Sequence, residues 1–453
     1  MPPVAPGHLV KLAEYPFVVV SWVDDEGYPM SVATDFTVDS GPGVVMLRAT
    51  AGDEASIPTD RPVNVLGSHI RPTPGQGYDE RRYVQLWGAA SRGPNDAVTF
   101  TPTRAWGWDE SEIPFFEYSE RSVPQSRRYL AQLSEEKGRT IRPRLSLGWL
   151  FLRTTRLPFL SATAVPVLLG IAVAARGGAF NLWLALLTVV GASLAHLAIN
   201  VSNDIFDTLS GADEANVNPT PFSGGSRVLI YDLLTLRQLI GVAATLLAGA
   251  VAIGLVLVWA TGSATLLWIG LTGIGLGLAY TAPPVKLVHR GLGEIAVAIG
   301  FGPVMLLGAY VVQTGSLSWE AAVASVPVAI LVALILYVNE IPDRVGDAAA
   351  GKRTLPVRLA PAMVTGIYLV AAVLAFAVVV GGVAAGLLPV ASLLALLAAP
   401  LVWQVYGGLR RFYTQPYALM PFMATNIKVH VYVGLLLLVG YGVAILARLL
   451  SLG

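Results

Sequence analysis

Residues 200–227 read NVSNDIFDTLSGADEANVNPTPFSGGSR, and they lead from the end of a long apolar stretch into a polar loop. Asn200, Asp204 and Asp207 are spaced i, i+4 and i+7, so a helix would project all three from one face. Carboxylates at the end of a membrane helix repel one another and are expensive to desolvate, and they therefore usually mark function. The stretch predicts a helical membrane protein with an acidic site at a helix end.

A second acidic set lies later in the chain, where NEIPDRVGD places Asn339, Asp343 and Asp347 at i, i+4 and i+8. Magnesium takes one or two protein carboxylates and completes its octahedron with water and phosphate oxygens. One acidic triplet alone is more often a solvated helix end, but two sets, each followed by basic residues, favour a site that holds a diphosphate between metal ions. The predicted Mg²⁺ ligands are Asp204, Asp207, Asp343 and Asp347.

The composition excludes several classes of protein. Of the 453 residues, 54% are hydrophobic and 13% are charged, and the mean hydropathy is +0.63, which is too apolar for an ordinary soluble protein. The formal net charge of +1 argues against a nucleic-acid partner. Because the chain has no cysteine, it has no disulfide, no thiolate metal site and no cysteine nucleophile.

Residues 1–136 form a separate predicted domain, in which short β-rich runs alternate with turn residues. Strands at this spacing, enriched in β-branched residues, indicate a small antiparallel β-barrel. A short helix is expected at 126–136, and a basic linker at 137–156 leads to a membrane domain at 157–453. The predicted strands lie in 17–23, 30–38, 44–48, 63–68 and 83–90.

The membrane domain contains nine apolar stretches of about the 20 residues that a bilayer requires. They predict an all-α transmembrane bundle of nine helices, so the chain as a whole is a multi-domain protein. The predicted spans are 157–175, 182–203, 236–259, 264–281, 293–313, 320–340, 362–381, 386–406 and 429–449.

Basic residues are distributed unevenly between the loops of this bundle. Most of the Arg and Lys residues lie in the segment before the first span and in every second loop after it. These loops join spans two and three, four and five, six and seven, and eight and nine. The opposite loops contain Arg176 and almost nothing else that is basic. By the positive-inside rule, the N-terminal domain and both acidic helix ends are cytoplasmic, in a multi-pass protein of the plasma (inner) membrane.

The same face carries the other predicted site residues. Carboxylates, Mg²⁺ and a ring of Arg and Lys together stabilise a departing diphosphate, although basic residues there also serve as membrane anchors. His196 could line the cavity, but a packing role is the commoner one for such a residue. Tyr280, at a helix-breaking YTAPP, is a predicted catalytic residue beside the reacting carbon. The predicted substrate-binding residues are Asn200, Asn203, Arg227, Lys286, Arg290, Asn339, Lys352 and Arg353.

From about residue 145 onward the chain resembles the UbiA superfamily of intramembrane prenyltransferases. NDIFDTLSGAD (Asn203–Asp213) is similar to the first Asp motif of that family, and NEIPDRVGDAAAGKRTLPVRL (Asn339–Leu359) to the second. Within the family, the AAAGKRTLPVRL tail, GPVMLLGAYVVQTG and LPFLSATAVPVLLG most resemble the 1,4-dihydroxy-2-naphthoate polyprenyltransferases of menaquinone synthesis. Gly211 stands where some branches have a third Asp, which leaves Asp213 as a helper.

The resemblance implies Mg²⁺-dependent transfer of a polyprenyl group from polyprenyl diphosphate to an aromatic acceptor, inside the lipid bilayer. The four aspartates with Mg²⁺, together with Arg227, Lys286, Lys352 and Arg353, would draw off diphosphate. The allylic cation would remain in a cavity that excludes water. In the naphthoate branch, the ring carbon that attacks it also loses CO₂.

Residues 8–125 are similar to split-barrel flavin-binding domains of the pyridoxamine-phosphate-oxidase type, through PFVVVSWVDDEGYPMSVATDF and RPVNVLG. The resemblance implies an FMN site in which Arg48 and Thr50 are the nearest phosphate partners. The segment Ala49–Asp60 has three acids, which would repel a phosphate, and no basic residue. A cofactor-free accessory domain is therefore favoured over flavin binding.

Two other functions stay open at this point. The acceptor of a prenyltransferase of this kind could be 4-hydroxybenzoate, homogentisate, a chlorin, haem or a glycerol phosphate lipid. A multi-spanning transporter or lipid-binding protein would also have polar helix ends at membrane depth. A transporter, however, is expected to place charge near the bilayer midplane, whereas these acids cluster at one face.

Overall fold

The structure is a computed structural model that describes residues 6–39, 41–48, 57–73, 77–93, 98–143, 145–216 and 218–452. The chain divides into two compact units, Met1–Ser122 and Val123–Gly453. Each unit has its own hydrophobic core. The predicted domain limits at 136 and 156 stay predictions.

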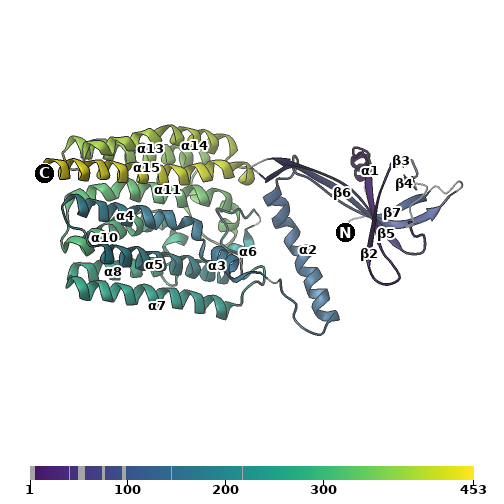
Figure 1. Cartoon of the computed structure of the whole chain (residues 1–453), viewed down its shortest axis with the longest axis horizontal. Coiled ribbons are helices and arrows are strands. Elements are labelled where there is room, and N and C mark those ends of the chain that lie inside the picture. Colours follow the sequence, from purple (N-terminus) through teal and green to yellow (C-terminus); the bar gives the residue numbers. More distant parts are fainter. Residues whose placement is uncertain are drawn as a thin grey trace. The chain divides into compact units, whose positions relative to one another are not determined.

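The N-terminal unit is a short helix and a seven-stranded antiparallel sheet (Figure 1). The strand order is β2-β1-β5-β6-β7-β4-β3. The helix is α1 (Pro6–Leu12), and the strands are β1 (Val18–Val23), β2 (Pro29–Thr34), β3 (Phe36–Asp39), β4 (Val44–Leu47), β5 (Pro62–Thr73), β6 (Gly77–Arg92) and β7 (Val98–Asp109).

Alternation of side chains explains why these runs pair as a sheet. In β1, Val18, Val20 and Trp22 are buried while the residues between them are more exposed, as expected for a strand with one face on a core. The predicted strand 30–38 is two strands that meet at Asp35, and β7 was not predicted. The antiparallel sheet is confirmed, whereas its closure into an FMN-type barrel stays a prediction.

The second unit is helical. Its first helix, α2 (Phe115–Glu136), begins eleven residues before the predicted 126 and crosses the limit between the units. The remaining elements are α3 (Leu147–Thr155), η2 (Leu157–Leu160), α4 (Ser161–Arg176), α5 (Leu182–Leu209), α6 (Ala212–Ala215), α7 (Leu236–Thr261), α8 (Ala264–Thr281), η3 (Leu287–Arg290), α9 (Gly293–Ile299), η4 (Gly300–Val304), α10 (Met305–Thr314), α11 (Trp319–Ala349), α12 (Leu355–Arg358), α13 (Pro361–Ala384), η5 (Val390–Ala398), α14 (Ala399–Phe412) and α15 (Pro416–Leu452).

Eight helical segments in the described part of the chain are long and apolar enough to cross a membrane. They correspond to the second to ninth predicted spans. At the place of the first, α4 is apolar but has only 16 residues, so the count of nine is not confirmed. The chain is a multi-pass membrane protein.

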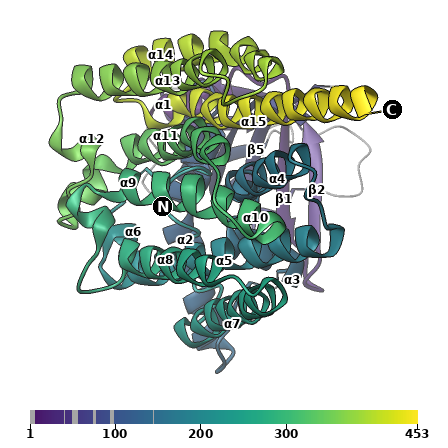
Figure 2. The same ribbon diagram turned by 90° about the vertical axis from the view of Figure 1, so that its left-hand side faces the viewer.

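Helix α11 is the centre of the bundle. Its most apolar window is 67% buried, compared with 11% for α7 and α8. Figure 2 shows α11 between α7 at one edge and α13 with α14 at the opposite edge. Buried Leu, Val, Ala and Tyr side chains of α11 pack with those of α4, α13, η5, α14 and α15 in one core. The end of α11 that carries the second acidic set is therefore held by neighbours on several sides.

Candidate active site

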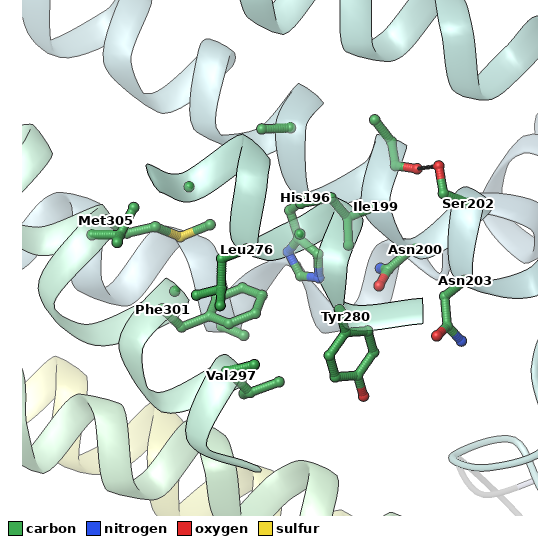
Figure 3. Close-up of a pocket in the computed structure, with 18 of the residues that line it drawn as sticks. His196, Ile199, Asn200, Ser202, Asn203, Leu276, Tyr280, Val297, Phe301 and Met305 are labelled. Carbon is green, nitrogen blue, oxygen red and sulfur yellow. Dashed lines mark hydrogen bonds between the residues drawn. The ribbon is translucent and has the colours of Figure 1, made fainter. Parts of the chain in front are cut away.

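A cavity of about 470 Å³ lies between α5, α7, α8, α9, α10 and α11. Most of its wall is apolar, but the residues at one end are acids, amides and a lysine. Figure 3 shows this change along the wall, with Met305, Phe301 and Leu276 on one side of the view and Asn200 and Asn203 on the other. Such a cavity fits a ligand with a polar head and a long apolar tail.

Asp207, near the end of α5, lines the polar end of this cavity. Its Oδ2 accepts hydrogen bonds from Nδ2 of Asn203 and Nζ of Lys352, both at 3.1 Å. Its Oδ1 is buried and has no hydrogen-bond partner among the described residues, and Nε2 of His289 lies 3.9 Å away. Asn200 also lines the cavity, and its Nδ2 donates to the carbonyl oxygen of Thr155 at 3.3 Å.

Asp204 has a different environment. It is 1% exposed, and its carboxylate accepts hydrogen bonds from the Ser226 backbone N–H, at 2.9 and 3.1 Å, and from the Ser226 hydroxyl. A Cβ on Gly225, whose φ is +71°, would lie 2.9 Å from Oδ1 of Asp204 and 2.8 Å from Oδ2 of Asp213. Only glycine therefore allows the loop to approach these acids so closely.

The second acidic set lies on α11, and all three of its members line the cavity. Asp343 accepts hydrogen bonds from Nδ2 of Asn216 at 2.7 Å and from the Gly224 backbone N–H at 2.9 Å. A Cβ on Gly346 would lie 2.8 Å from Cα of Asn216, so this glycine lets α11 pack directly against the loop after α6. The structure thus brings the two acidic motifs together, as the sequence predicted.

Lys352 joins the two motifs. Its Nζ lies 3.1 Å from Oδ2 of Asp207 and 3.5 Å from Oδ1 of Asp347, and its side chain is almost buried. Burial alone would lower the pKa of Lys352, but the charges of Asp207 and Asp347 raise it above its ordinary value. Lys352 is therefore a fixed cation at the polar end of the cavity.

The other predicted cations lie outside the cavity wall as far as the structure describes it. Arg227 donates from Nη1 to the carbonyl oxygens of Asp213 at 2.9 Å and Asn216 at 3.3 Å. Arg353 is exposed, and its backbone N–H donates to the His289 carbonyl oxygen at 3.0 Å. Arg290 donates to the Pro284 carbonyl oxygen at 3.0 Å, and Lys286 is partly buried in the same turn. Their predicted contact with substrate stays a prediction.

Tyr280 points into the cavity from the end of α8 (Figure 3). His196 also lines the cavity. Its Nδ1 lies 2.7 Å from the Thr163 hydroxyl oxygen, and its ring is edge-on to Phe301.

Arg156, Asn216 and Glu340 also line the cavity, and sequence reasoning missed them. Arg156 precedes η2 in a left-handed conformation, and its Nη2 donates to the Phe222 carbonyl oxygen at 3.0 Å. Asn216 holds Asp343, as described above, and Glu340 is a buried acid of α11. An acid inside an apolar span is a signal for function by itself, so the sequence could have indicated Glu340.

The acids fit a Mg²⁺ ion that is shared with a diphosphate. In the described ranges, no group of three or more His, Asp or Glu side chains is arranged so that it could hold a metal ion. However, Asp207, Asp213, Asp343 and Asp347 line one end of the cavity, and a buried oxygen of Asp207 lacks a partner. Burial and then the charges of Asp207 and Asp204 raise the pKa of Asp213 well above its usual value. Mg²⁺ normally takes few protein carboxylates and completes its shell with phosphate oxygens and water.

The sequence matches the model of the UbiA prenyltransferase family over residues 163–427. The chain belongs to this family. It is therefore a prenyltransferase, and the resemblance of its two Asp motifs to this family is confirmed. The match begins after the N-terminal unit and contains both acidic motifs.

Several characterised relatives are similar to this UbiA prenyltransferase. One is a 2-carboxy-1,4-naphthoquinone phytyltransferase from Synechocystis sp., 29% identical over 301 residues that cover 65% of this chain and 93% of the relative. Another is a 1,4-dihydroxy-2-naphthoate octaprenyltransferase from Mycobacterium tuberculosis, 32% identical over 249 residues that cover 54% of this chain and 80% of the relative.

Solved structures of UbiA homologues are also similar. One from Aeropyrum pernix is 20% identical, with a TM-score of 0.46, and the match covers 62% of this chain and 97% of that one. One from Archaeoglobus fulgidus, bound to DMAPP and Mg²⁺, is 13% identical, with a TM-score of 0.41, over 63% of this chain and 98% of that one.

The predicted FMN site is only partly described. Arg48 follows β4, and its backbone N–H donates to the Asp35 carbonyl oxygen at 2.9 Å. Thr50 lies outside the described residues. FMN binding stays a prediction that no observation supports.

Proposed function

We propose that this UbiA prenyltransferase transfers a polyprenyl group from its diphosphate to 1,4-dihydroxy-2-naphthoate, with Mg²⁺, in menaquinone biosynthesis. The observation that carries the proposal is a single cavity that joins two acidic helix ends and Lys352 to a long apolar wall. The naphthoate acceptor is supported by the names of the relatives from Synechocystis sp. and M. tuberculosis.

The polar end of the cavity is the proposed site of the diphosphate. Asp207, Asp343 and Asp347 would hold Mg²⁺ there, and the ion would neutralise charge on the diphosphate when bound. Lys352 lies among them as a preformed cation, so it would stabilise the charge that develops on the leaving diphosphate. The predicted ligand role of Asp204 stays a prediction, because Asp204, unlike Asp343, is not among the described residues that line the cavity and is bonded to Ser226.

The apolar wall would hold the prenyl chain and exclude water. Glycines, leucines, isoleucines and valines of α7, α8 and α10 line this part of the cavity. Exclusion of water protects an allylic cation from hydrolysis until the aromatic ring attacks it. Tyr280 and Phe301 both line the cavity, and the reacting carbon would lie near Tyr280 (Figure 3).

The proposal includes an orientation in the membrane. The eight apolar helices make this a multi-pass protein, and the distribution of Arg and Lys supports a cytoplasmic location for the acidic helix ends and the N-terminal unit. The membrane would be the plasma (inner) membrane.

Transfer of isotope from a labelled polyprenyl diphosphate tests the proposal directly. Purified full-length protein in lipid nanodiscs would be incubated with Mg²⁺ and a panel of acceptors, and the products identified by mass. We expect one prenylated product from 1,4-dihydroxy-2-naphthoate, with a mass that shows loss of CO₂. Chelation of divalent ions should abolish it.

Other members of the panel decide between acceptors. They are 4-hydroxybenzoate, homogentisate, a chlorin, haem and a glycerol phosphate lipid. Preferential transfer to any of them would replace the naphthoate in the proposal. Absence of transfer to every acceptor, from protein that still binds polyprenyl diphosphate, would contradict the transferase assignment and favour a lipid-binding or transport role.

A further inference from the structure

Glu340 is a buried acid of the cavity wall that the diphosphate site does not use. It lies on α11 between Asn339 and the acids that follow, and its side chain is 5% exposed. No hydrogen bond of good geometry reaches Oε1 or Oε2 of Glu340 from the residues that the structure describes, although the carboxyl group of Glu294 is close enough to share one with it. A buried carboxyl group with unfilled acceptor positions is unfavourable, so the positions that Glu294 does not fill are available to a ligand.

The surroundings of Glu340 contain further unpaired oxygens. Oε1 of Glu294, on α9, and Oδ1 of Asn339 are buried and also lack a partner within the described ranges. Glu294 is 9% exposed, and its carboxyl group interacts electrostatically with that of Glu340. Tyr280 interacts with both acids. This part of the wall therefore offers hydrogen-bond acceptors in excess of donors.

That excess decides which ligand would fit. The oxygens of a diphosphate are acceptors themselves, so they would repel Glu340 rather than satisfy it. A ligand with hydroxyl donors on an apolar body matches the site, because Val297 and Phe301 line the same cavity as Glu340. Figure 3 shows these two apolar side chains. An aromatic ring that carries hydroxyl groups has this chemistry.

We propose that Glu340 accepts a hydrogen bond from a ring hydroxyl of the aromatic acceptor and so positions its ring beside Tyr280. The inference rests on the proposed function, which supplies a hydroxylated aromatic substrate. The neighbouring carboxyl group of Glu294 interacts with that of Glu340. The acceptor subsite is thus on the α8, α9 and α11 side of the cavity, while Lys352 and the aspartates of the two motifs hold the diphosphate.

The test measures both substrates separately in Glu340→Gln and Glu340→Leu. Loss of a hydrogen-bond partner that leaves a buried hydroxyl unsatisfied costs about 1–3 kcal/mol, or roughly 5- to 150-fold in binding. In Glu340→Leu we expect the KM for 1,4-dihydroxy-2-naphthoate to rise by about that factor, while the KM for polyprenyl diphosphate and the Mg²⁺ dependence stay within about twofold. Glu340→Gln keeps an acceptor oxygen and should show a smaller rise.

Ligands that lack one ring hydroxyl test whether Glu340 contacts that hydroxyl directly. Binding of 1-hydroxy-2-naphthoate and of 4-hydroxy-2-naphthoate would be measured by equilibrium dialysis against wild type and Glu340→Leu. If Glu340 contacts one hydroxyl, loss of that hydroxyl should weaken binding to wild type but have little effect on Glu340→Leu, so the two losses are not additive. Additive losses for both ligands would overturn the proposal.

Two comparisons separate this inference from a structural role and from the proposed function. Glu320→Gln is the matched control, because Glu320 lies at the other end of α11 and pairs with Arg176; its acceptor KM should not change. A parallel rise in both substrate KM values, or a changed Mg²⁺ dependence, would contradict the proposed contact.

If wild type prefers another hydroxylated ring, the naphthoate assignment fails and the same cycle is run with that ring. If wild type neither binds nor prenylates any hydroxylated ring, both proposals fail.

Discussion

Asp204 and Asp207 lie one turn apart on α5, yet they have opposite surroundings. The carboxylate of Asp204 faces the loop and accepts hydrogen bonds from Ser226. The carboxylate of Asp207 faces the cavity and accepts a hydrogen bond from Lys352. A similar difference is found on α11. Asp343 accepts a hydrogen bond from the Gly224 backbone N–H, while Asp347 forms an ion pair with Lys352. The first acid of each motif thus fixes the glycine loop, and the second holds the buried cation.

The comparison predicts the largest loss for the acid that faces the cavity. Asp207→Asn removes a single negative charge, which would bind Mg²⁺ and which forms the shorter ion pair with Lys352. We therefore expect kcat/KM to fall by about 10³-fold. The remaining activity should need more Mg²⁺ than wild type. Titration of transfer against Mg²⁺ checks both. An unchanged Mg²⁺ requirement would place the metal elsewhere.

Neighbouring cations give the next test. Lys352 is almost buried beside Asp207 and Asp347, whereas Arg353 is exposed. Lys352→Met should lower kcat by about 10²-fold through loss of charge at the leaving diphosphate, and Arg353→Met should stay close to wild type. Single-turnover rates of labelled transfer measure both. An equal loss in the two variants would favour direct contact of Arg353 with substrate, as the sequence predicted.

A smaller effect is expected where an acid only holds the loop. Asp204→Asn should lower kcat/KM by about tenfold through a weakened bond to Ser226. Ser226→Ala should have a similar effect, and neither variant should alter the Mg²⁺ requirement. A Mg²⁺ requirement that shifts in Asp204→Asn but not in Ser226→Ala would make Asp204 a metal ligand.

The smallest change concerns packing between the two motifs. In Gly346→Ala the new Cβ meets the backbone of Asn216, and overpacking of this kind costs about 1–3 kcal/mol. We expect a lower Tm and little change in the KM for acceptor. Gly366→Ala on α13 is the control, since its Cβ would meet nothing within 4 Å. Equal Tm values for the two variants would show that the helix end adapts.

The sequence predicted the antiparallel strands, the apolar spans and both acidic motifs, because these follow from periodicity and from charge within apolar segments. It did not distinguish Asp207, which lines the cavity, from Asp204, which bonds to the loop at Ser226. Asp204 finds its partner 22 residues later at Ser226, and the path of the intervening loop decides that contact. Similarly, Arg227 is bonded to backbone oxygens of its own loop, which its position after two glycines does not reveal.

In the loop at 222–226, both backbone N–H groups and backbone carbonyl oxygens form hydrogen bonds with side chains from outside the loop. Asp343 and Asp204 accept from the N–H groups of Gly224 and Ser226, while Arg156 and Arg153 donate to the carbonyl oxygens of Phe222 and Ser226. Loops rich in glycine normally exchange their amide hydrogens quickly, since local opening is easy. Here the amides of Gly224 and Ser226 should exchange with deuterium as slowly as helix amides, even before any substrate is bound.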